Sequence, residues 1–269
     1  MCFEPDSMPP VLAGCPTDTE IRTELTALTS ADGTRFAAFT AIPATSEQGL
    51  VDALGVVVLP DVRGLYGFYQ QLAIALAHHG HPSAVIDYYG RTAGIGTRGD
   101  DFPFMDHAVR TSEATVQADL RAAADHLRTL GGPAMAGVAS VGFCFGGRHA
   151  FLSASPAHGL AAAVGFYGVP GIAGPYGPGP TQRASELTAP ILGIFGGADP
   201  YIPPDEVGAF DSALTASRTP HHLVSYPDAP HSFFDVSHDD KHAEASRDAW
   251  NRTLAFLRDP AGYLRTTVQ

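Results

Sequence analysis

Apolar and polar residues occur in blocks along the chain, and the period of the pattern differs between blocks. Residues 54–59 form a continuous apolar run rich in valine, which is typical of a strand buried on both faces of a parallel sheet. Residues 66–80 instead place Phe68, Leu72 and Leu76 at helical spacing and end at a glycine. The predicted strands cover 21–28, 35–43, 54–59, 84–86, 137–141, 161–166, 191–195 and 222–226, and the predicted helices cover 66–80, 111–130, 145–154, 205–216 and 241–257.

The repeated order of strand and helix predicts an α/β fold with a mostly parallel central sheet and helices on both faces. Before the first of these units, the Asp32-Gly33 pair separates two strand-like runs, and this hairpin signal predicts antiparallel strands at one edge of the sheet. Residues 1–20 are acidic and rich in proline, and we expect them to form an amino-terminal arm. No break in composition divides residues 21–269, which are expected to form one domain.

The charge of the chain limits its partners. It has 16 Lys and Arg residues against 28 Asp and Glu residues, a formal net charge of -12. Such a surface repels phosphate backbones and anionic lipids, so neither nucleic acid nor a membrane is expected as a partner. No run of 18 apolar residues is present, and three cysteines are too few for a disulfide framework, so a cytoplasmic protein is expected. The composition leaves a monomer and a homodimer equally open.

The strongest local signal for chemistry is Gly142-Phe143-Cys144-Phe145-Gly146, between a predicted strand and a predicted helix. It matches the nucleophile elbow, with cysteine in the place that serine usually takes. The small glycines allow a tight turn, and a helix that begins at Phe145 directs its N–H groups and its dipole toward Cys144, which favours a thiolate or an oxyanion. A buried structural cysteine in a glycine-rich turn is the alternative interpretation.

Two further residues follow predicted strands in a suggestive order. Asp199 comes after the strand at 191–195, and His231 lies in the loop after the strand at 222–226. The order nucleophile, acid, base is that of the α/β-hydrolase arrangement, and all three side chains are then expected at one rim of the sheet. Each also has a structural alternative, with Asp199 as a turn former before proline and His231 as a polar loop residue.

Aromatic and glycine-rich motifs recur at the ends of the predicted strands. They are Leu59-Pro60-Asp61-Val62-Arg63-Gly64, Asp87-Tyr88-Tyr89-Gly90-Arg91, the stretch from Gly142 to Gly147, Gly165-Phe166-Tyr167-Gly168, Gly197-Ala198-Asp199 and Pro230-His231-Ser232-Phe233. Through these motifs the sequence, from about Leu25 to Leu257, resembles the dienelactone hydrolase family, the cysteine branch of the α/β-hydrolase fold. The resemblance implies a triad of Cys144, His231 and Asp199 that acts on a lactone or an ester. It also implies an oxyanion hole built from the backbone N–H groups of Phe145 and Val62.

Two positions depart from the pattern of that family. Asp61 stands where the family has a glutamate that holds the resting thiol and exchanges partners as the thiolate forms. Because Asp61 is one methylene shorter, it either plays this role less well or only positions its loop. The family binds a substrate carboxylate with two arginines, of which the first corresponds to Arg91 and the second, four residues beyond His231, to Asp235. The residues expected to contact the substrate are Arg91, Tyr88, Tyr89, Ser232 and Asp235.

No pattern predicts a metal or a cofactor. His238, Asp239, Asp240 and His242 could bind a metal ion, but acidic residues before a helix serve equally as caps, and no recognised ligand spacing is present. No G-x-G-x-x-G follows an early strand, so a nicotinamide or flavin is not expected.

The sequence therefore predicts a cofactor-free hydrolase of the carboxymethylenebutenolidase type, which cleaves a small-molecule lactone or ester through an acyl thioester on Cys144. A carboxylated dienelactone is disfavoured as the substrate because Asp235 replaces a cation. The alternatives are a thioesterase or tailoring enzyme for a larger neutral metabolite, and a binding protein that keeps the fold without turnover.

Overall fold

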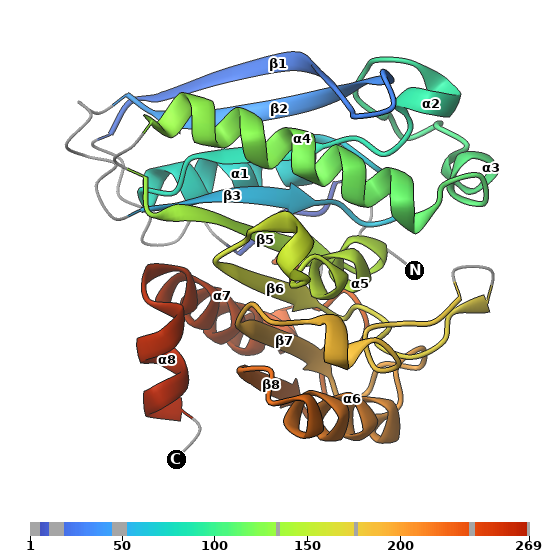
Figure 1. Cartoon of the computed structure of the whole chain (residues 1–269), viewed down its shortest axis with the longest axis vertical. Coiled ribbons are helices and arrows are strands. Elements are labelled where there is room, and N and C mark those ends of the chain that lie inside the picture. Colours follow the sequence, from blue (N-terminus) through green and yellow to red (C-terminus); the bar gives the residue numbers. More distant parts are fainter. Residues whose placement is uncertain are drawn as a thin grey trace.

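The computed structural model describes residues 6–10, 19–44, 53–132, 135–174, 177–236 and 240–267. It contains an eight-stranded sheet with the order β1-β2-β4-β3-β5-β6-β7-β8 (Figure 1). The strands are β1 (Ile21–Thr29), β2 (Arg35–Pro43), β3 (Leu54–Leu59), β4 (Ser83–Ile86), β5 (Gly137–Phe143), β6 (Ala162–Phe166), β7 (Ile191–Gly196) and β8 (His221–Tyr226). β2 is antiparallel to β1 and β4, and the remaining neighbours pair in parallel. The predicted α/β sheet with an antiparallel edge is confirmed.

Helices cover both faces of this sheet (Figure 1). They are α1 (Gly67–His78), α2 (Gly90–Ala93), α3 (Phe104–Ala108), α4 (Glu113–Gly131), α5 (Phe145–Leu152), α6 (Pro204–Ser217), α7 (Ala243–Arg258) and α8 (Pro260–Thr267), with short 3₁₀ turns at Pro156–His158, Ala184–Glu186 and Asp240–His242. The ring of His79, directly after α1, contacts Trp250 of α7, and Phe151 of α5 contacts Phe210 of α6. Within the described ranges, no helix has the length and apolar character needed to cross a membrane.

Strand β3 illustrates how the sequence pattern produces these layers. All six of its residues are buried, as expected for a strand covered on both faces. Val56 and Val58 join the apolar cluster that contains Leu72 of α1, whereas Val57 joins the cluster that contains Leu120 of α4. Successive side chains of a strand point to opposite faces, so one continuous apolar run supplies both clusters.

Two regions differ from the sequence-based expectation. The chain does not end its helical structure with α7, because a second helix, α8, begins at Pro260. Proline is favoured at the first position of a helix, and the Asp259 carboxylate accepts a hydrogen bond from the Gly262 N–H at 2.8 Å, which helps to start α8. The segment expected to be irregular after β4 contains the short helices α2 and α3.

The described part of the predicted amino-terminal arm, residues 6–10, packs against the rest of the chain. The side chains of Ser7, Pro9 and Pro10 are buried, and Ser7 is only 4% exposed. This segment contacts the loop after β8, at Asp235 and Val236. Part of the predicted arm is therefore packed against the domain that follows it.

Candidate active site

Cys144 sits at a sharp turn between β5 and α5. Its backbone has φ +53° and ψ -114°, a conformation that residues other than glycine rarely adopt and that costs about 1–3 kcal/mol. The turn is held on both sides. The Cys144 N–H donates to the Phe166 carbonyl at 2.9 Å, and the Arg148 N–H donates to the Cys144 carbonyl at 3.1 Å. The strained turn has the geometry of the predicted nucleophile elbow.

The glycines on either side of Cys144 are required by close backbone approaches. A Cβ atom on Gly142 would lie 2.1 Å from the carbonyl oxygen of Gly146, and a Cβ atom on Gly146 would lie 2.1 Å from that of Leu59. Both distances are far inside van der Waals contact. Only glycine at both positions lets α5 start this close to β5 and β3.

The loops after β7 and β8 bring Asp199 and His231 into contact. His231 Nδ1 lies 2.6 Å from Asp199 Oδ2, and the Tyr201 N–H donates to Asp199 Oδ1 at 2.8 Å. The Ala198 N–H donates to the Ala229 carbonyl at 3.0 Å, so the two loops are joined through their backbones. Both oxygens of the buried Asp199 carboxylate thus accept hydrogen bonds, and the imidazole is held in one orientation.

His231 also contacts Cys144, so it lies between the thiol and Asp199. Burial alone lowers the pKa of His231, but hydrogen bonds to Asp199 and to Cys144 outweigh it and raise the pKa to about 9. The rings of Tyr167 and Tyr201 lie 4.9 and 5.3 Å from the imidazole, measured between centroids. At neutral pH the imidazole is therefore mostly protonated, which favours a thiolate at Cys144.

Asp61 is a second carboxyl group beside Cys144. Its side chain is 1% exposed. Burial has the largest effect on its pKa and raises it to about 7. The Asp61 carboxylate accepts hydrogen bonds from the Arg63 N–H at 2.7 Å and from the Tyr66 hydroxyl at 2.9 Å, and both lower its pKa. A negative charge on Cys144 raises the pKa further. Asp61 is thus divided between its acid and its carboxylate form near neutral pH.

Tyr88 and Tyr89 hold the loop that carries Val62. The Tyr88 hydroxyl donates to the Pro60 carbonyl at 2.7 Å, and the Tyr89 hydroxyl donates to the Val62 carbonyl. Both side chains are buried. No hydrogen bond within the described ranges occupies the Val62 N–H. The tyrosines therefore hold the peptide groups on either side of the one whose N–H is expected to donate to an oxyanion.

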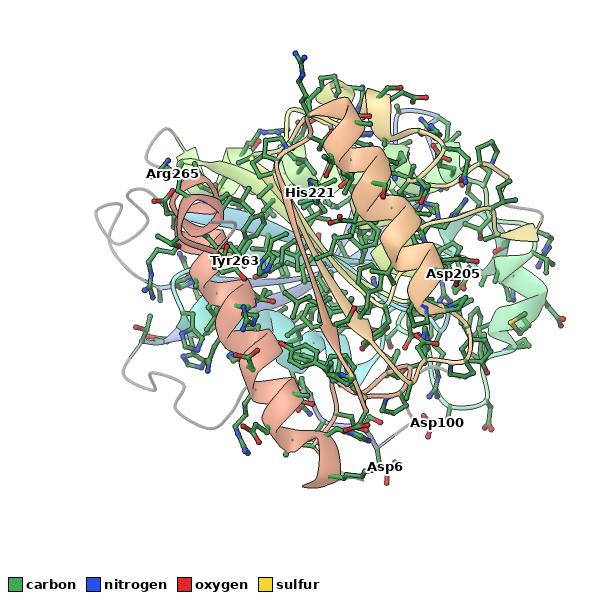
Figure 2. The ribbon with its side chains drawn as sticks, turned by 90° about the horizontal axis from the view of Figure 1, so that it is seen from below. Asp6, Asp100, Asp205, His221, Tyr263 and Arg265 are labelled. Atoms are coloured by element: carbon green, nitrogen blue, oxygen red, sulfur yellow. The ribbon has the colours of Figure 1, made fainter. Side chains whose placement is uncertain are left out.

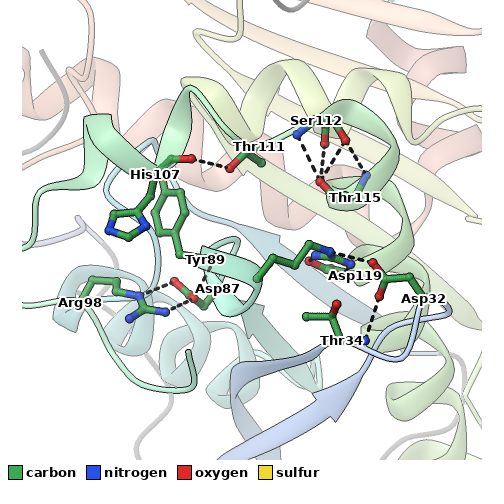
Figure 3. Close-up of polar contacts among 11 residues, drawn as sticks. Asp32, Thr34, Asp87, Tyr89, Arg98, His107, Thr111, Ser112, Thr115 and Asp119 are labelled. Carbon is green, nitrogen blue, oxygen red and sulfur yellow. Dashed lines mark hydrogen bonds and ion pairs between the residues drawn. The ribbon is translucent and has the colours of Figure 1, made fainter. Parts of the chain in front are cut away.

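A buried ion pair that the sequence reasoning missed supports the same loop. Arg98 Nη2 lies 2.6 Å from Asp87 Oδ2, and the Arg98 N–H donates to the Leu65 carbonyl at 2.7 Å (Figure 3). The Leu65 N–H in turn points to Asp87 Oδ1 at 3.4 Å. The sequence does place Asp87 directly after β4, and this position could have indicated its role, because polar residues at the carboxyl ends of strands lie near the ligand site of an α/β sheet.

The remaining candidate substrate contacts are Arg91, Asp235 and Ser232. Arg91 donates through two nitrogens to Asp119 of α4, at 2.6 and 2.8 Å, and through Nε to Asp32 at 2.8 Å. Figure 3 shows the side chains of Asp32 and Asp119 close together. Two carboxylates occupy the guanidinium, which argues for a structural role. Asp235 accepts hydrogen bonds from residues 7 and 8. Ser232 lies beside His231 with φ +60°.

The long loop after β6 is attached to the helix that follows Cys144. The buried Arg148 side chain of α5 donates to four carbonyls of this loop, which belong to Val169, Gly171, Gly177 and Pro178. One guanidinium therefore joins two parts of the loop, residues 169–171 and 177–178, to α5.

Across the described ranges, no group of three or more His, Cys, Asp or Glu side chains gathers in an arrangement that would hold a metal ion. His238 and Asp239, considered above as metal ligands, lie outside the described residues, as do Cys2 and Cys15.

Comparison with known proteins agrees with this geometry. The family model of the dienelactone hydrolase family matches residues 36–260. The chain belongs to the dienelactone hydrolase family. The carboxymethylenebutenolidase of Rhodococcus opacus is 30% identical over 231 residues, which cover 80% of this chain and 83% of that protein. An Escherichia coli K12 protein named "putative carboxymethylenebutenolidase" is 30% identical over 210 residues, 77% of each chain.

A solved structure supports the same assignment. The crystal structure of a "putative dienelactone hydrolase" from Klebsiella pneumoniae matches with a TM-score of 0.76 at 30% identity, over 89% of this chain and 99% of that one. The chain is therefore a hydrolase with the α/β-hydrolase fold, as the sequence predicted.

Proposed function

We propose that the protein hydrolyses a lactone or an ester of a small molecule with Cys144 as nucleophile, His231 as acid and base, and Asp199 as the partner of His231. The observation that carries this proposal is the position of His231, which contacts Asp199 at 2.6 Å on one side and Cys144, on a strained elbow, on the other. The relatives named carboxymethylenebutenolidase support a lactone as the substrate class.

In the first half of the reaction, the Cys144 thiolate attacks the carbonyl carbon and a tetrahedral oxyanion forms. The N–H groups of Phe145, in the first turn of α5, and of Val62 donate to this oxyanion. As the carbon–oxygen bond of the lactone or ester breaks, the protonated His231 donates its proton to the leaving oxygen. The product of this half is an acyl thioester on Cys144.

In the second half, His231 acts as a base. The thioester sulfur carries no negative charge, so the imidazole loses one of the two contacts that raise its pKa. The neutral imidazole then accepts a proton from water as the water attacks the thioester carbonyl. The Cys144 thiolate is restored beside the imidazolium, which pairs again with Asp199, and the carboxylic acid leaves and loses its remaining proton to solvent.

Asp61 controls the charge of the nucleophile in this proposal. An ionised Asp61 and a thiolate on Cys144 repel each other inside the protein, which is why Cys144 raises the pKa of Asp61. We infer that Asp61 is protonated while Cys144 is a thiolate and ionised while the sulfur is neutral, as it is in the thioester. The shorter side chain still fits this role because its carboxyl group is fixed by Tyr66 and by the Arg63 N–H.

The preferred substrate is a neutral or singly charged lactone or ester. Arg91 is already neutralised by Asp119 and Asp32, and Asp235 brings a negative charge to the loop after His231. A substrate carboxylate would therefore find neither member of the arginine pair.

Acyl-enzyme trapping tests the proposal. The protein is mixed with a p-nitrophenyl ester, quenched in acid within milliseconds, digested and examined by mass spectrometry. We expect the acyl mass on the peptide that contains Cys144, at a higher level in His231→Gln because deacylation needs the base. A neutral lactone should be hydrolysed by the same preparation. An acyl group on another residue, or steady turnover without any acyl-enzyme, would contradict the proposal.

A further inference from the structure

Asp235 joins the loop after β8 to the amino-terminal segment through a compact set of hydrogen bonds. The Ser7 hydroxyl donates to Asp235 Oδ2 at 2.6 Å, and the Met8 N–H donates to Oδ1 at 3.0 Å. The Val236 N–H returns a hydrogen bond to the Met8 carbonyl at 3.0 Å. Both carboxylate oxygens and the next backbone group are thus used to hold residues 7 and 8.

The segment Ser7–Pro10 is built into the molecule at this contact. Ser7, Pro9 and Pro10 are buried. Each proline has a fixed φ, so less conformational entropy is lost when the segment is ordered. The two hydrogen bonds to the Asp235 carboxylate and the burial of both prolines therefore attach this segment to the rest of the molecule.

This attachment lies at the end of the sheet that carries the candidate triad. Asp235 is four residues from His231, so at 3.8 Å per residue their Cα atoms are at most about 15 Å apart. Phe233, between them, contacts the ring of Tyr167, which contacts His231. Figure 2 shows Asp6 and Asp205 toward this end of the strands, and His221, at the start of β8, toward the opposite end.

The two donors of Ser7 and Met8 form a small anion-binding pair, and the protein itself supplies the anion. Hydrogen bonds from an O–H and an N–H to one carboxylate are the contacts by which a substrate carboxylate would also be recognised. Because Asp235 accepts both, an anionic group of the substrate could use these donors only by displacing it.

We propose that Asp235 is a specificity-determining residue that acts by holding Ser7–Pro10 at the rim of the substrate site. The held segment takes the space in which an anionic arm of a substrate would bind, so the site selects neutral esters and lactones. Asp235 is then a positioning residue, and its effect comes from the segment more than from its own charge. This inference rests on the proposed function.

Three substitutions separate the segment from the charge. Asp235→Asn removes the charge but keeps the attachment, because the amide oxygen accepts from the Met8 N–H and the amide nitrogen donates to the Ser7 hydroxyl. Asp235→Ala removes both the charge and the attachment. Ser7→Ala keeps the charge and removes one donor. Asp248→Ala is the matched control, since this carboxylate on α7 also accepts from two side chains, those of Tyr226 and Arg252.

Two measurements are made on each full-length variant. The first is the ratio of kcat/KM for a carboxylated ester to that for a neutral ester with the same leaving group. The second is hydrogen–deuterium exchange at the Met8 and Val236 amides. Asp235→Ala should raise the ratio about tenfold, mainly through a lower KM for the carboxylated ester, and should speed exchange. Asp235→Asn and Asp248→Ala should retain both the ratio and the slow amide exchange of the wild type. Ser7→Ala should give values between those of the wild type and those of Asp235→Ala.

The opposite results are equally clear. If Asp235→Asn raises the ratio as much as Asp235→Ala while exchange stays slow, the charge acts directly and the segment does not. If Asp235→Ala speeds exchange without changing the ratio, the segment is no part of the substrate site. If Cys144→Ala retains turnover, the proposed function fails and the specificity role fails with it, whereas the exchange data still report whether Asp235 holds the segment.

Discussion

The elbow around Cys144 and the loop around Asp235 lie at the same end of the sheet, but they are built differently. At the elbow, backbone atoms set the geometry: two glycines, a strained φ and peptide hydrogen bonds from β6 and α5 leave little freedom. At Asp235, side chains set it, through a carboxylate that binds a segment from the other end of the chain. The comparison indicates that backbone geometry sets the proposed reaction. The proposed choice of substrate depends instead on side-chain contacts that a few substitutions can change.

Removal of the nucleophile should give the largest effect. Cys144→Ala should lower kcat for ester hydrolysis by about 10⁴-fold or more, as expected when a covalent catalyst is lost. The double variant Cys2→Ser and Cys15→Ser should keep kcat close to the wild-type value, because the sequence around neither cysteine has the Gly-x-Cys-x-Gly pattern. Steady-state kinetics with p-nitrophenyl esters measures both effects. Substantial turnover by Cys144→Ala would show that the elbow does not carry the nucleophile.

A single methyl group should break the elbow. Gly146→Ala forces a Cβ atom to within 2.1 Å of the Leu59 carbonyl, so we expect a loss of about 3 kcal/mol or more in unfolding free energy and about a hundredfold in kcat/KM. Gly208→Ala is the matched control, since this glycine in α6 has no atom within 4 Å of the added Cβ. It should raise stability by about 0.5–1 kcal/mol. Denaturant titration decides, and equal behaviour of the two variants would refute the backbone argument.

The protonation of His231 should set the alkaline limit of activity. Its pKa is raised to about 9, so above that pH the imidazolium is lost, and with it the proton for the leaving oxygen. We expect log(kcat/KM) to fall with a slope of about one beyond pH 9, a tenfold loss per pH unit. The same shift adds stability that is complete below about pH 6.5 and disappears through pH 9. A flat profile up to pH 10 would show that His231 carries no essential proton.

Asp61 should show a conflict between activity and stability. We expect Asp61→Asn to lower kcat/KM at pH 7 about tenfold and to shift the pH profile, whereas Asp61→Glu should be tolerated. The raised pKa of Asp61 means that stability falls as the pH rises from about 4, where the unfolded chain ionises, to about 7, where the folded chain does. Asp61→Asn should remove this cost, up to about 4 kcal/mol above pH 7 and almost none at pH 4.

Thermal melts of wild type and Asp61→Asn at pH 4 and above pH 7 test whether the substitution raises stability only at the higher pH. A wild-type pH–rate profile in Asp61→Asn would instead make this carboxyl group purely structural.

The smallest kinetic effect is expected at Arg91. If its guanidinium only neutralises Asp119 and Asp32, Arg91→Met should change KM for neutral esters by less than about twofold. Stability should nevertheless fall by about 3–5 kcal/mol, because the Asp119 carboxylate is left buried without its partner. Asp119→Asn in the same background should restore part of the loss. A large rise in KM for anionic substrates, without one for neutral esters, would instead show that Arg91 contacts the substrate.

The sequence predicted what depends on neighbouring residues. Strand β3 and the Gly-x-Cys-x-Gly elbow could be recognised from a few consecutive positions, and the order of Cys144, Asp199 and His231 followed from the strand ends. It did not predict the contacts that no motif or strand end marks. The attachment of Ser7 to Asp235 joins residues 228 positions apart, and no periodic pattern signals it. The same holds for Arg91, whose family position suggested a substrate contact while Asp119 on another helix determines its actual partner.

The four carbonyls bound by Arg148 have a consequence for how this scaffold can be changed. Because one guanidinium fixes both Gly171 and Gly177, the residues between these two points start and end at places set by the helix that follows the nucleophile. Extra residues inserted between them would extend outward from a fixed base, at a modest entropic cost for the longer loop. Protein engineers could therefore graft new recognition segments at this point without disturbing the turn that positions the thiol.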